Sequence, residues 1–204
     1  VLMLNNINNP DIPAATPPPP PAAPCVYLAG GIEKAHDGGA AWRRELTGFL
    51  VDRLGHRVHD PTRDEPGLMS EEERQGFRLW KAQDEHWPRF QEVVRRIIHR
   101  DLQLILNDTD YIIAYWDESV LGGGGTHGEL TLAYWFGIPV YLVLGLPRAE
   151  ISSWILACAT EVFDSFEELK SRFVSTPPPE WNRKNPPPCD FPPPCPHPSP
   201  SGDL

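Results

Sequence analysis

The stretch 110–143 most constrains the fold of this chain, because it reads DYIIAYWDESVLGGGGTHGELTLAYWFGIPVYLV. Its first part, Tyr111–Trp116, is a β-branched and aromatic run of the kind that fills a buried parallel strand. Four glycines follow, then an apolar helical pattern, and then a second apolar run that begins with Pro139. The order strand, glycine loop, helix, strand predicts a parallel α/β sheet.

The polar residues of this stretch are predicted to meet at one edge of that sheet. Asp117 stands where the strand ends, and the crevice of an open α/β sheet lies beyond the carboxyl ends of its strands. The glycine loop ends at Gly125, and the next helix is expected to begin after it. The backbone N–H groups of its first turn, which includes Thr126, would bind an oxygen atom or an anion. Glu129 follows on the first turn. It either borders the crevice or closes a capping box with Thr126, because T-x-x-E is the pattern of that box.

The flanking sequence predicts further elements of the same kind. Gly30 and Gly31 end the first strand, where absent side chains let the chain turn close to a ligand. An amphipathic stripe predicts a long helix before the central strand, and Asp101 on this helix is either solvated or directed at the crevice. The expected strands are 26–29, 57–59, 111–116, 139–144 and 161–163, and the expected helices are 40–54, 93–106, 126–136, 151–159 and 166–173.

The segment 62–98 has the weakest pattern. Ser70 and Glu73 fit a capping box, and Pro88 must kink or restart a helix. The tryptophans and phenylalanines of this segment either pack against a core or form a lid over the crevice. We expect packing, because large aromatic residues at helical spacing usually face a core.

Charge and composition exclude several classes of protein. A net charge of −10 argues against a sequence-independent nucleic-acid binder, which needs a basic surface. No apolar run is long enough for a membrane span, and the first residues lack the pattern of a signal peptide, so we expect a cytoplasmic protein that does not bind membranes. The four cysteines have no C-x-x-C spacing, and we expect no metal and no cofactor.

Most of the 25 prolines lie in the two ends of the chain. Residues 1–24 and 175–204 are therefore expected to be disordered tails, because such sequences cannot bury a core. Residues 25–174 are expected to form one α/β domain of ordinary size.

The sequence resembles the nucleoside 2-deoxyribosyltransferase-like superfamily, which includes nucleoside and nucleotide N-glycosidases. The resemblance rests on YLAGGI, NDTDYIIAYWD, GGGGTHGELTLAYWFGIPVYLV and SSWILACATEVFDSFEEL. It implies a flavodoxin-like (Rossmann-like) three-layer domain with a five-stranded parallel sheet. It also implies a homodimer that transfers or hydrolyses the deoxyribosyl or ribosyl group of a small-molecule nucleoside or nucleotide.

The resemblance assigns roles to individual residues. Glu129 would be the nucleophile, Asp101 the carboxylate that holds and helps to protonate the leaving base, and Tyr27 the hydroxyl that orients Glu129. Ser153 would reach the 5′ end of the sugar from the neighbouring chain. The substrate-binding positions are expected to be Gly30, Gly31, Asp117, Gly125, Thr126 and Ser153.

Two other functions fit the same residues. GGGGTHGEL also resembles the G-G-x-G-T-x-x-E motif of phosphoribohydrolases that release bases from nucleoside monophosphates. A noncatalytic nucleotide-binding or sensor domain is the third possibility, but a pure binder does not need both Glu129 and Asp101. His127, beside the nucleophile, is expected to face solvent rather than a phosphate.

Overall fold

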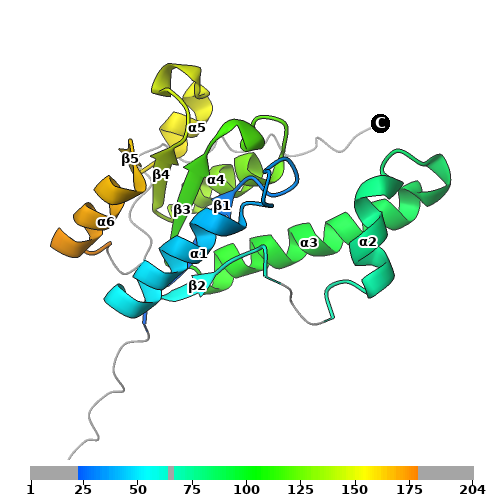
Figure 1. Cartoon of the computed structure of the whole chain (residues 1–204), viewed down its shortest axis with the longest axis horizontal. Coiled ribbons are helices and arrows are strands. Elements are labelled where there is room, and N and C mark those ends of the chain that lie inside the picture. The colour runs from blue at the N-terminus through cyan, green and yellow to red at the C-terminus, as the bar shows by residue number, and fades with distance from the viewer. Residues whose placement is uncertain (1–22, 64–66, 179–204) are drawn as a thin grey trace, which may run out of the picture.

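The computed structural model describes residues 23–63 and 67–178 (Figure 1). The expected tails fall almost entirely outside these residues. Between β1 (Cys25–Gly30) and α6 (Phe166–Ser175) the chain alternates strands and helices. In the described residues, no helix is both long enough and apolar enough to cross a membrane.

Five strands form one fully parallel sheet in the order β2-β1-β3-β4-β5. This is the flavodoxin-like order, so the fold class expected from the sequence is confirmed. The strands that follow β1 are β2 (Arg57–His59), β3 (Tyr111–Trp116), β4 (Val140–Leu144) and β5 (Glu161–Phe163). The chain adds β2 on one side of β1 and then crosses over to add β3 on the other side. This reversal of strand order between β1 and β3 is a topological switch point, which places a crevice at their carboxyl ends.

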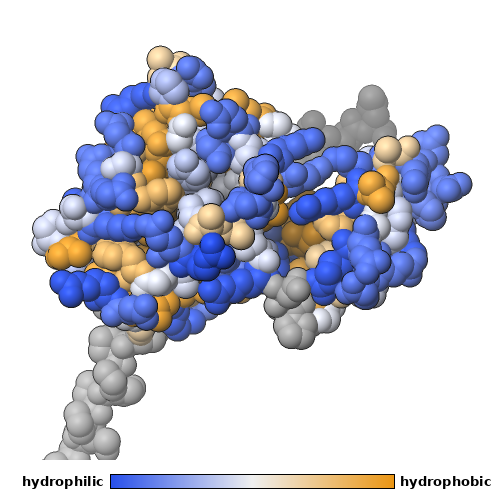
Figure 2. Space-filling model, viewed as in Figure 1, coloured by the Kyte–Doolittle hydropathy of each residue, from blue (hydrophilic) through white to orange (hydrophobic). Residues whose placement is uncertain are grey.

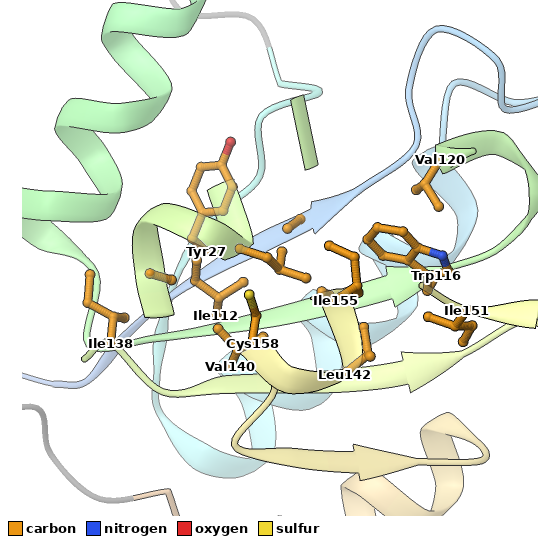
Figure 3. Packing of buried hydrophobic residues seen from close by; sticks show 14 of the residues in the cluster. Tyr27, Ile112, Trp116, Val120, Ile138, Val140, Leu142, Ile151, Ile155 and Cys158 are labelled. Atoms are coloured by element: carbon orange, nitrogen blue, oxygen red, sulfur yellow. The ribbon is translucent and has the colours of Figure 1, made fainter. Parts of the chain in front are cut away.

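Helices cover both faces of the sheet and enclose two separate cores. On one face, α3 (Trp87–Asp108), α4 (Gly125–Phe136) and α5 (Ser153–Cys158) pack over a cluster that contains Tyr27 and Trp116 (Figure 3). On the other face, α1 (Ala40–Gly48) and α6 pack over Leu28 and Tyr141. Alternate residues of β1 therefore serve opposite faces, as the period of a strand requires.

The α2–α3 hairpin is the part of the fold that the sequence described least well. Here α2 (Glu71–Trp80) begins in a complete capping box between Ser70 and Glu73, as expected. A short 3-10 turn follows, and α3 restarts with Pro88 in its first turn, where a missing N–H costs nothing. The long α3 then carries α2 at its far end, away from the sheet (Figure 1).

Element ends differ from the expectations by a few residues. The first helix continues past Gly48 as a π-helical turn, Phe49–Arg53, and ends before Gly55, as its spacing predicted. The expected helix 151–159 is shorter in the structure, because Ser152 is in an extended conformation and its side chain accepts the N–H of Trp154. A serine in that role begins a helix rather than continuing one.

Candidate active site

A cavity of about 1010 Å³ lies at the carboxyl ends of β1 and β3, under the α2–α3 hairpin. Figure 2 shows the molecule hollowed between the α2 end and the sheet, with apolar side chains inside. The sheet side supplies the β1 turn, the glycine loop and the first turns of α4. The predicted site residues that line the cavity are Gly30, Gly31, Asp101, Gly125, Thr126 and Glu129.

Glu129 and Tyr27 form the central contact of this site. The Tyr27 hydroxyl donates to Glu129 Oε1 at 2.8 Å, and Tyr27 itself has no exposed surface. The capping-box interpretation of Thr126 and Glu129 is wrong. Gly124 is the residue that precedes the helix, no side chain caps it, and Glu129 lies beyond the first turn. The Glu129 carboxylate is therefore held by a core hydroxyl and not by its own helix end.

The surroundings of Glu129 make its negative charge costly. Burial and the nearby charge of Asp101 raise the pKa of the Glu129 carboxyl from 4.5 to about 7, although the Tyr27 hydrogen bond acts to lower this pKa. Burial also raises the pKa of Tyr27 well above its ordinary value, and the Glu129 charge adds to that effect. Tyr27 therefore stays a hydroxyl donor throughout the physiological range. A carboxyl group that titrates near neutral pH in a cavity is a candidate for catalysis.

Asp101 reaches the same cavity from the middle of α3. Its side chain is 13% exposed, and its Oδ1 accepts a hydrogen bond from Arg100 Nε at 2.8 Å. Arg100 also lines the cavity. The two predicted catalytic carboxylates thus come from different helices, α3 and α4, and border one space. The residue pattern alone had left open whether either side chain faces the crevice.

The turn after β1 packs tightly against Ser119, which follows β3. A Cβ atom on Gly31 would lie 1.8 Å from Ser119 Oγ, so only glycine fits there. Arg43, fully buried in α1, donates to the backbone oxygens of Gly30 at 2.9 Å and Gly39 at 3.0 Å. This guanidinium, which sequence reasoning missed, fixes the rim of the cavity.

Asp117 and Ser153 do not line the cavity. The Asp117 carboxylate accepts the backbone N–H and the hydroxyl of Ser119 and so caps the short 3-10 turn Glu118–Val120. Ser119 reaches the cavity in its place. Ser153 is exposed at the start of α5. A site for Ser153 in a neighbouring chain stays a prediction.

The α2–α3 hairpin supplies cavity residues that the sequence analysis did not assign. Phe77 and Phe90 line the cavity, whereas Trp80 is buried and stacks against the Arg89 guanidinium at 4.4 Å. Trp80 therefore packs against its neighbours, as expected. Phe77 and Phe90 instead face the cavity, as the lid interpretation predicted. The hairpin and the loops opposite it also bring basic side chains to the cavity, namely Lys34, Arg63, Arg74, Arg78, Lys81 and Arg100.

His127, which was expected to face solvent, is only partly exposed. Its ring packs edge-on against Trp116, with ring centroids 4.8 Å apart. The buried His127 Nδ1 has no hydrogen-bond partner among the described residues. It is also outside the set of residues that line the cavity, so we assign it a packing role.

The cavity itself contains no cluster suited to a metal ion in the described part of the chain. The one group of His, Cys, Asp and Glu side chains there with ligand-like spacing is Cys25, His59 and Asp108, and none of these lines the cavity. The groups available for chemistry in the cavity are carboxylates that include Glu129 and Asp101, the glycine-loop backbone and basic side chains, and the buried Tyr27 hydroxyl is linked to them by its hydrogen bond to Glu129.

Comparisons with known proteins give matches to solved structures. No protein-family model and no curated protein matches the chain. Among solved structures it is similar to the Clostridium botulinum CMP N-glycosidase BcmB, with a TM-score of 0.42 and 16% sequence identity. The match covers 74% of this chain and 98% of that chain. At these values the likeness is a distant one of fold.

Proposed function

We propose that this protein is an enzyme that cleaves or transfers the N-glycosidic bond of a nucleoside or nucleoside 5′-monophosphate. The observation that carries the proposal is the Tyr27–Glu129 hydrogen bond on the wall of the cavity. A carboxylate fixed by a buried hydroxyl and titrating near neutrality suits a nucleophile at the anomeric carbon. The whole of 25–174 would form the catalytic domain, between the tails 1–24 and 175–204.

The reaction follows from the roles of the two carboxylates. Breaking the bond between C1′ and the base nitrogen builds positive charge on the sugar, and ionised Glu129 would stabilise that charge and form an ester with C1′. The bonding electrons leave with the base, and Asp101 would hold the base and, in its protonated form, pass its proton to the base nitrogen. The ion pair with Arg100 keeps Asp101 oriented toward the shared space. Water or a second base then takes the sugar from Glu129.

The cations that surround the cavity favour a phosphorylated substrate. Lys34 lies beside the glycine loop, because a Cβ atom on Gly122 would be 3.9 Å from Lys34 Cγ. Arg78 lines the cavity from α2. These side chains, with the N–H groups at the start of α4, offer the donors that a 5′-phosphate needs. The adjacent Phe77 and Phe90 provide an apolar surface for the base.

Release of free base tests the proposal directly. A panel of deoxyribonucleosides, ribonucleosides and their 5′-monophosphates is incubated with the wild-type chain and with Glu129→Gln, with and without a second base. We expect release by the wild type alone, and dependence on the acceptor base would identify a transferase. Binding without turnover across the panel would replace the proposal with the sensor function.

Lys34→Ala separates nucleotide from nucleoside recognition. If Lys34 contacts a 5′-phosphate, the variant should raise KM at least tenfold for a monophosphate and leave kcat/KM for the matching nucleoside unchanged. Arg44→Ala is a suitable control, because Arg44 is an exposed cation that does not line the cavity. An equal loss for both substrates would remove the phosphate role of Lys34.

The arginines on α2 also support a second candidate function. A phosphoribohydrolase of the G-G-x-G-T-x-x-E type needs arginine side chains near the phosphate, and Arg74 and Arg78 reach the cavity from this helix. Such an enzyme would accept ribonucleoside monophosphates and reject all deoxyribosyl substrates and all acceptor bases. The same panel therefore distinguishes it from the first proposal.

A further inference from the structure

A second group of reactive side chains lies around the start of β1, and none of its members lines the cavity. Cys25 begins β1, His59 ends β2, and Asp108 is the last residue of α3. One ligand atom from each of the three residues lies within 4.8 Å of the other two. We propose that Cys25, His59 and Asp108 bind a zinc ion.

The geometry of the three groups is close to that of a metal site. Asp108 Oδ2 lies 2.7 Å from His59 Nε2 and 4.0 Å from Cys25 Sγ. Bonds of about 2.0–2.3 Å to a tetrahedral zinc place its ligand atoms about 3.5 Å apart. To bind zinc, the ligand atoms of Asp108 and His59 must therefore move apart, and those of Asp108 and Cys25 must move closer together. Each change is less than an ångström. Side-chain rotation can supply such shifts without moving the strands.

The type of ligand selects the metal. Sulfur, imidazole nitrogen and carboxylate oxygen are all zinc ligands, whereas Mg²⁺ and Ca²⁺ prefer oxygen alone. Three protein ligands leave the fourth position to water. The Cys25 thiolate and the Asp108 carboxylate together balance the charge of the ion. Because the thiol must lose its proton, each zinc ion bound releases one proton from Cys25.

The charged side chain beside these ligands, that of Arg57, still allows a zinc ion to bind. Arg57 Nη2 lies 2.8 Å from Asp108 Oδ1, and Arg57 Nη1 lies 3.0 Å from Oδ2. These hydrogen bonds are the main reason that the pKa of Asp108 is lowered to about 2. Zinc at Oδ2 would displace only Nη1, and the contact at Oδ1 would then orient the bound carboxylate. The start of β1 is fixed as well, because the Cys25 N–H donates to Asp110 Oδ2 at 2.7 Å.

Cobalt(II) is the probe for this site, because a thiolate bound to cobalt gives a charge-transfer band in the near ultraviolet. The full chain carries Cys189→Ser and Cys195→Ser, so that thiols of the C-terminal segment do not contribute. After removal of metals by a chelator, we expect one cobalt ion per chain, a charge-transfer band, and visible bands of four-coordinate cobalt. Zinc should displace the cobalt and remove both sets of bands.

Variants of the three ligands decide whether this site is the one occupied. Cys25→Ser should abolish the charge-transfer band, and Cys158→Ser, the other described buried cysteine, should keep it. His59→Gln should weaken zinc binding at least tenfold. The His59 side chain is 23% exposed, so this variant is expected to fold even if Cys25→Ser does not.

Two results would overturn the proposal. One is less than one cobalt ion bound per chain in the folded wild type. The other is a charge-transfer band or zinc affinity that His59→Gln leaves unchanged. Neither result bears on base release from the cavity, because none of the three ligands lines it.

Discussion

The Glu129 carboxyl group shows how a single residue takes its properties from the fold. On its own helix it would be one of many acidic residues near an N-terminus. Burial beside Asp101 raises its pKa to about 7, and Tyr27 supplies the hydrogen bond that keeps the ionised form accessible. At neutral pH about half of the molecules would carry the charge that a nucleophile needs.

The pH dependence of base release should follow this titration. Because Glu129 must be ionised to attack, kcat/KM should fall as the pH drops through about 7. Tyr27→Phe removes the hydrogen bond that lowers the Glu129 pKa, so this acid limb should move upward by about one pH unit. The measurement is a pH profile of kcat/KM for each variant. Tyr141→Phe, a buried tyrosine of the opposite core, is the control and should leave the limb in place.

Glu129 should also cost the protein stability at alkaline pH. In the folded protein the pKa of Glu129 lies above its ordinary value of 4.5. The contribution of Glu129 to stability is therefore fully present below pH 4.5 and is lost as the pH rises through about 7. Glu129→Gln removes the buried charge and should stabilise the fold by about 3 kcal/mol near pH 8. Below about pH 4.5 the gain should vanish. Urea unfolding at both pH values tests this, and equal stability of wild type and variant near pH 8 would contradict it.

At the scale of elements, the turn from β1 into α1 shows how packing positions the site. The guanidinium of Arg43 is completely buried and donates to four backbone oxygens, those of Leu28, Gly30, Gly31 and Gly39. Its Nε also lies 3.7 Å from Asp60 Oδ1. One side chain of α1 therefore joins the end of β1, the loop after it and the residue that follows β2.

Removal of this arginine should destabilise the whole turn. Arg43→Met leaves several carbonyl groups without this donor and removes a cation beside the buried Asp60 carboxylate, so we expect a loss of about 3–5 kcal/mol in the free energy of unfolding. Arg43→Lys should recover only part of this loss, because an ammonium group lacks the planar fork of five donors. Denaturant unfolding measures both variants. Arg44→Met, which changes the exposed neighbour, should alter stability by less than about 0.5 kcal/mol.

The glycines of the site differ in how much space the surrounding atoms leave for a Cβ atom. Gly31→Ala places a methyl group 1.8 Å from Ser119 Oγ and should cost about 1–3 kcal/mol by overpacking. Gly124→Ala meets nothing within 4 Å and should be nearly neutral. Ser119→Gly in the Gly31→Ala background should restore part of the stability. Thermal unfolding compares the three variants, and equal effects of the two alanines would refute the packing argument.

At the scale of the whole molecule, an apolar surface at the end of α4 and on α5 supports the expected homodimer. Its exposed residues are Tyr134, Trp135, Phe136 and Trp154. Exposed aromatic residues in one region commonly mark a protein interface. Ser153 lies beside Trp154, so an interface here would bring it close to a second chain, as its predicted role requires.

Trp135→Glu should therefore convert a dimer into a monomer. Trp135 is 64% exposed, so the substitution should not unfold the chain, but it would bury a charge in the proposed interface. Light scattering after size exclusion gives the mass. Leu79→Glu is the control, because Leu79 is 67% exposed on α2, far from this surface. A wild-type chain that is already a monomer at the highest concentrations would rule out the dimer.

The sequence by itself determined the elements and their sheet. Strand and helix periods, the glycines at 30–31 and 122–125, and the acid positions on α3 and α4 are local patterns, so one chain segment carries each of them. They predicted five parallel strands and placed Glu129 and the two glycine turns near one edge, whereas they left open whether Asp101 faces the crevice or solvent. The physical reason is that a parallel sheet brings the carboxyl ends of all its strands to the same side.

Only the tertiary structure decided which side chains meet. The Tyr27–Glu129 bond joins residues 102 positions apart, and the zinc-ligand group joins the start of β1 to the ends of β2 and α3. The lid over the cavity depends on how α2 folds back on α3, and this contact includes ion pairs between the two helices. Arg89 and Arg96 of α3 bind Glu72 and Glu73 of α2. Such pairings have no signature in a local pattern, because their energy appears only after distant segments pack together.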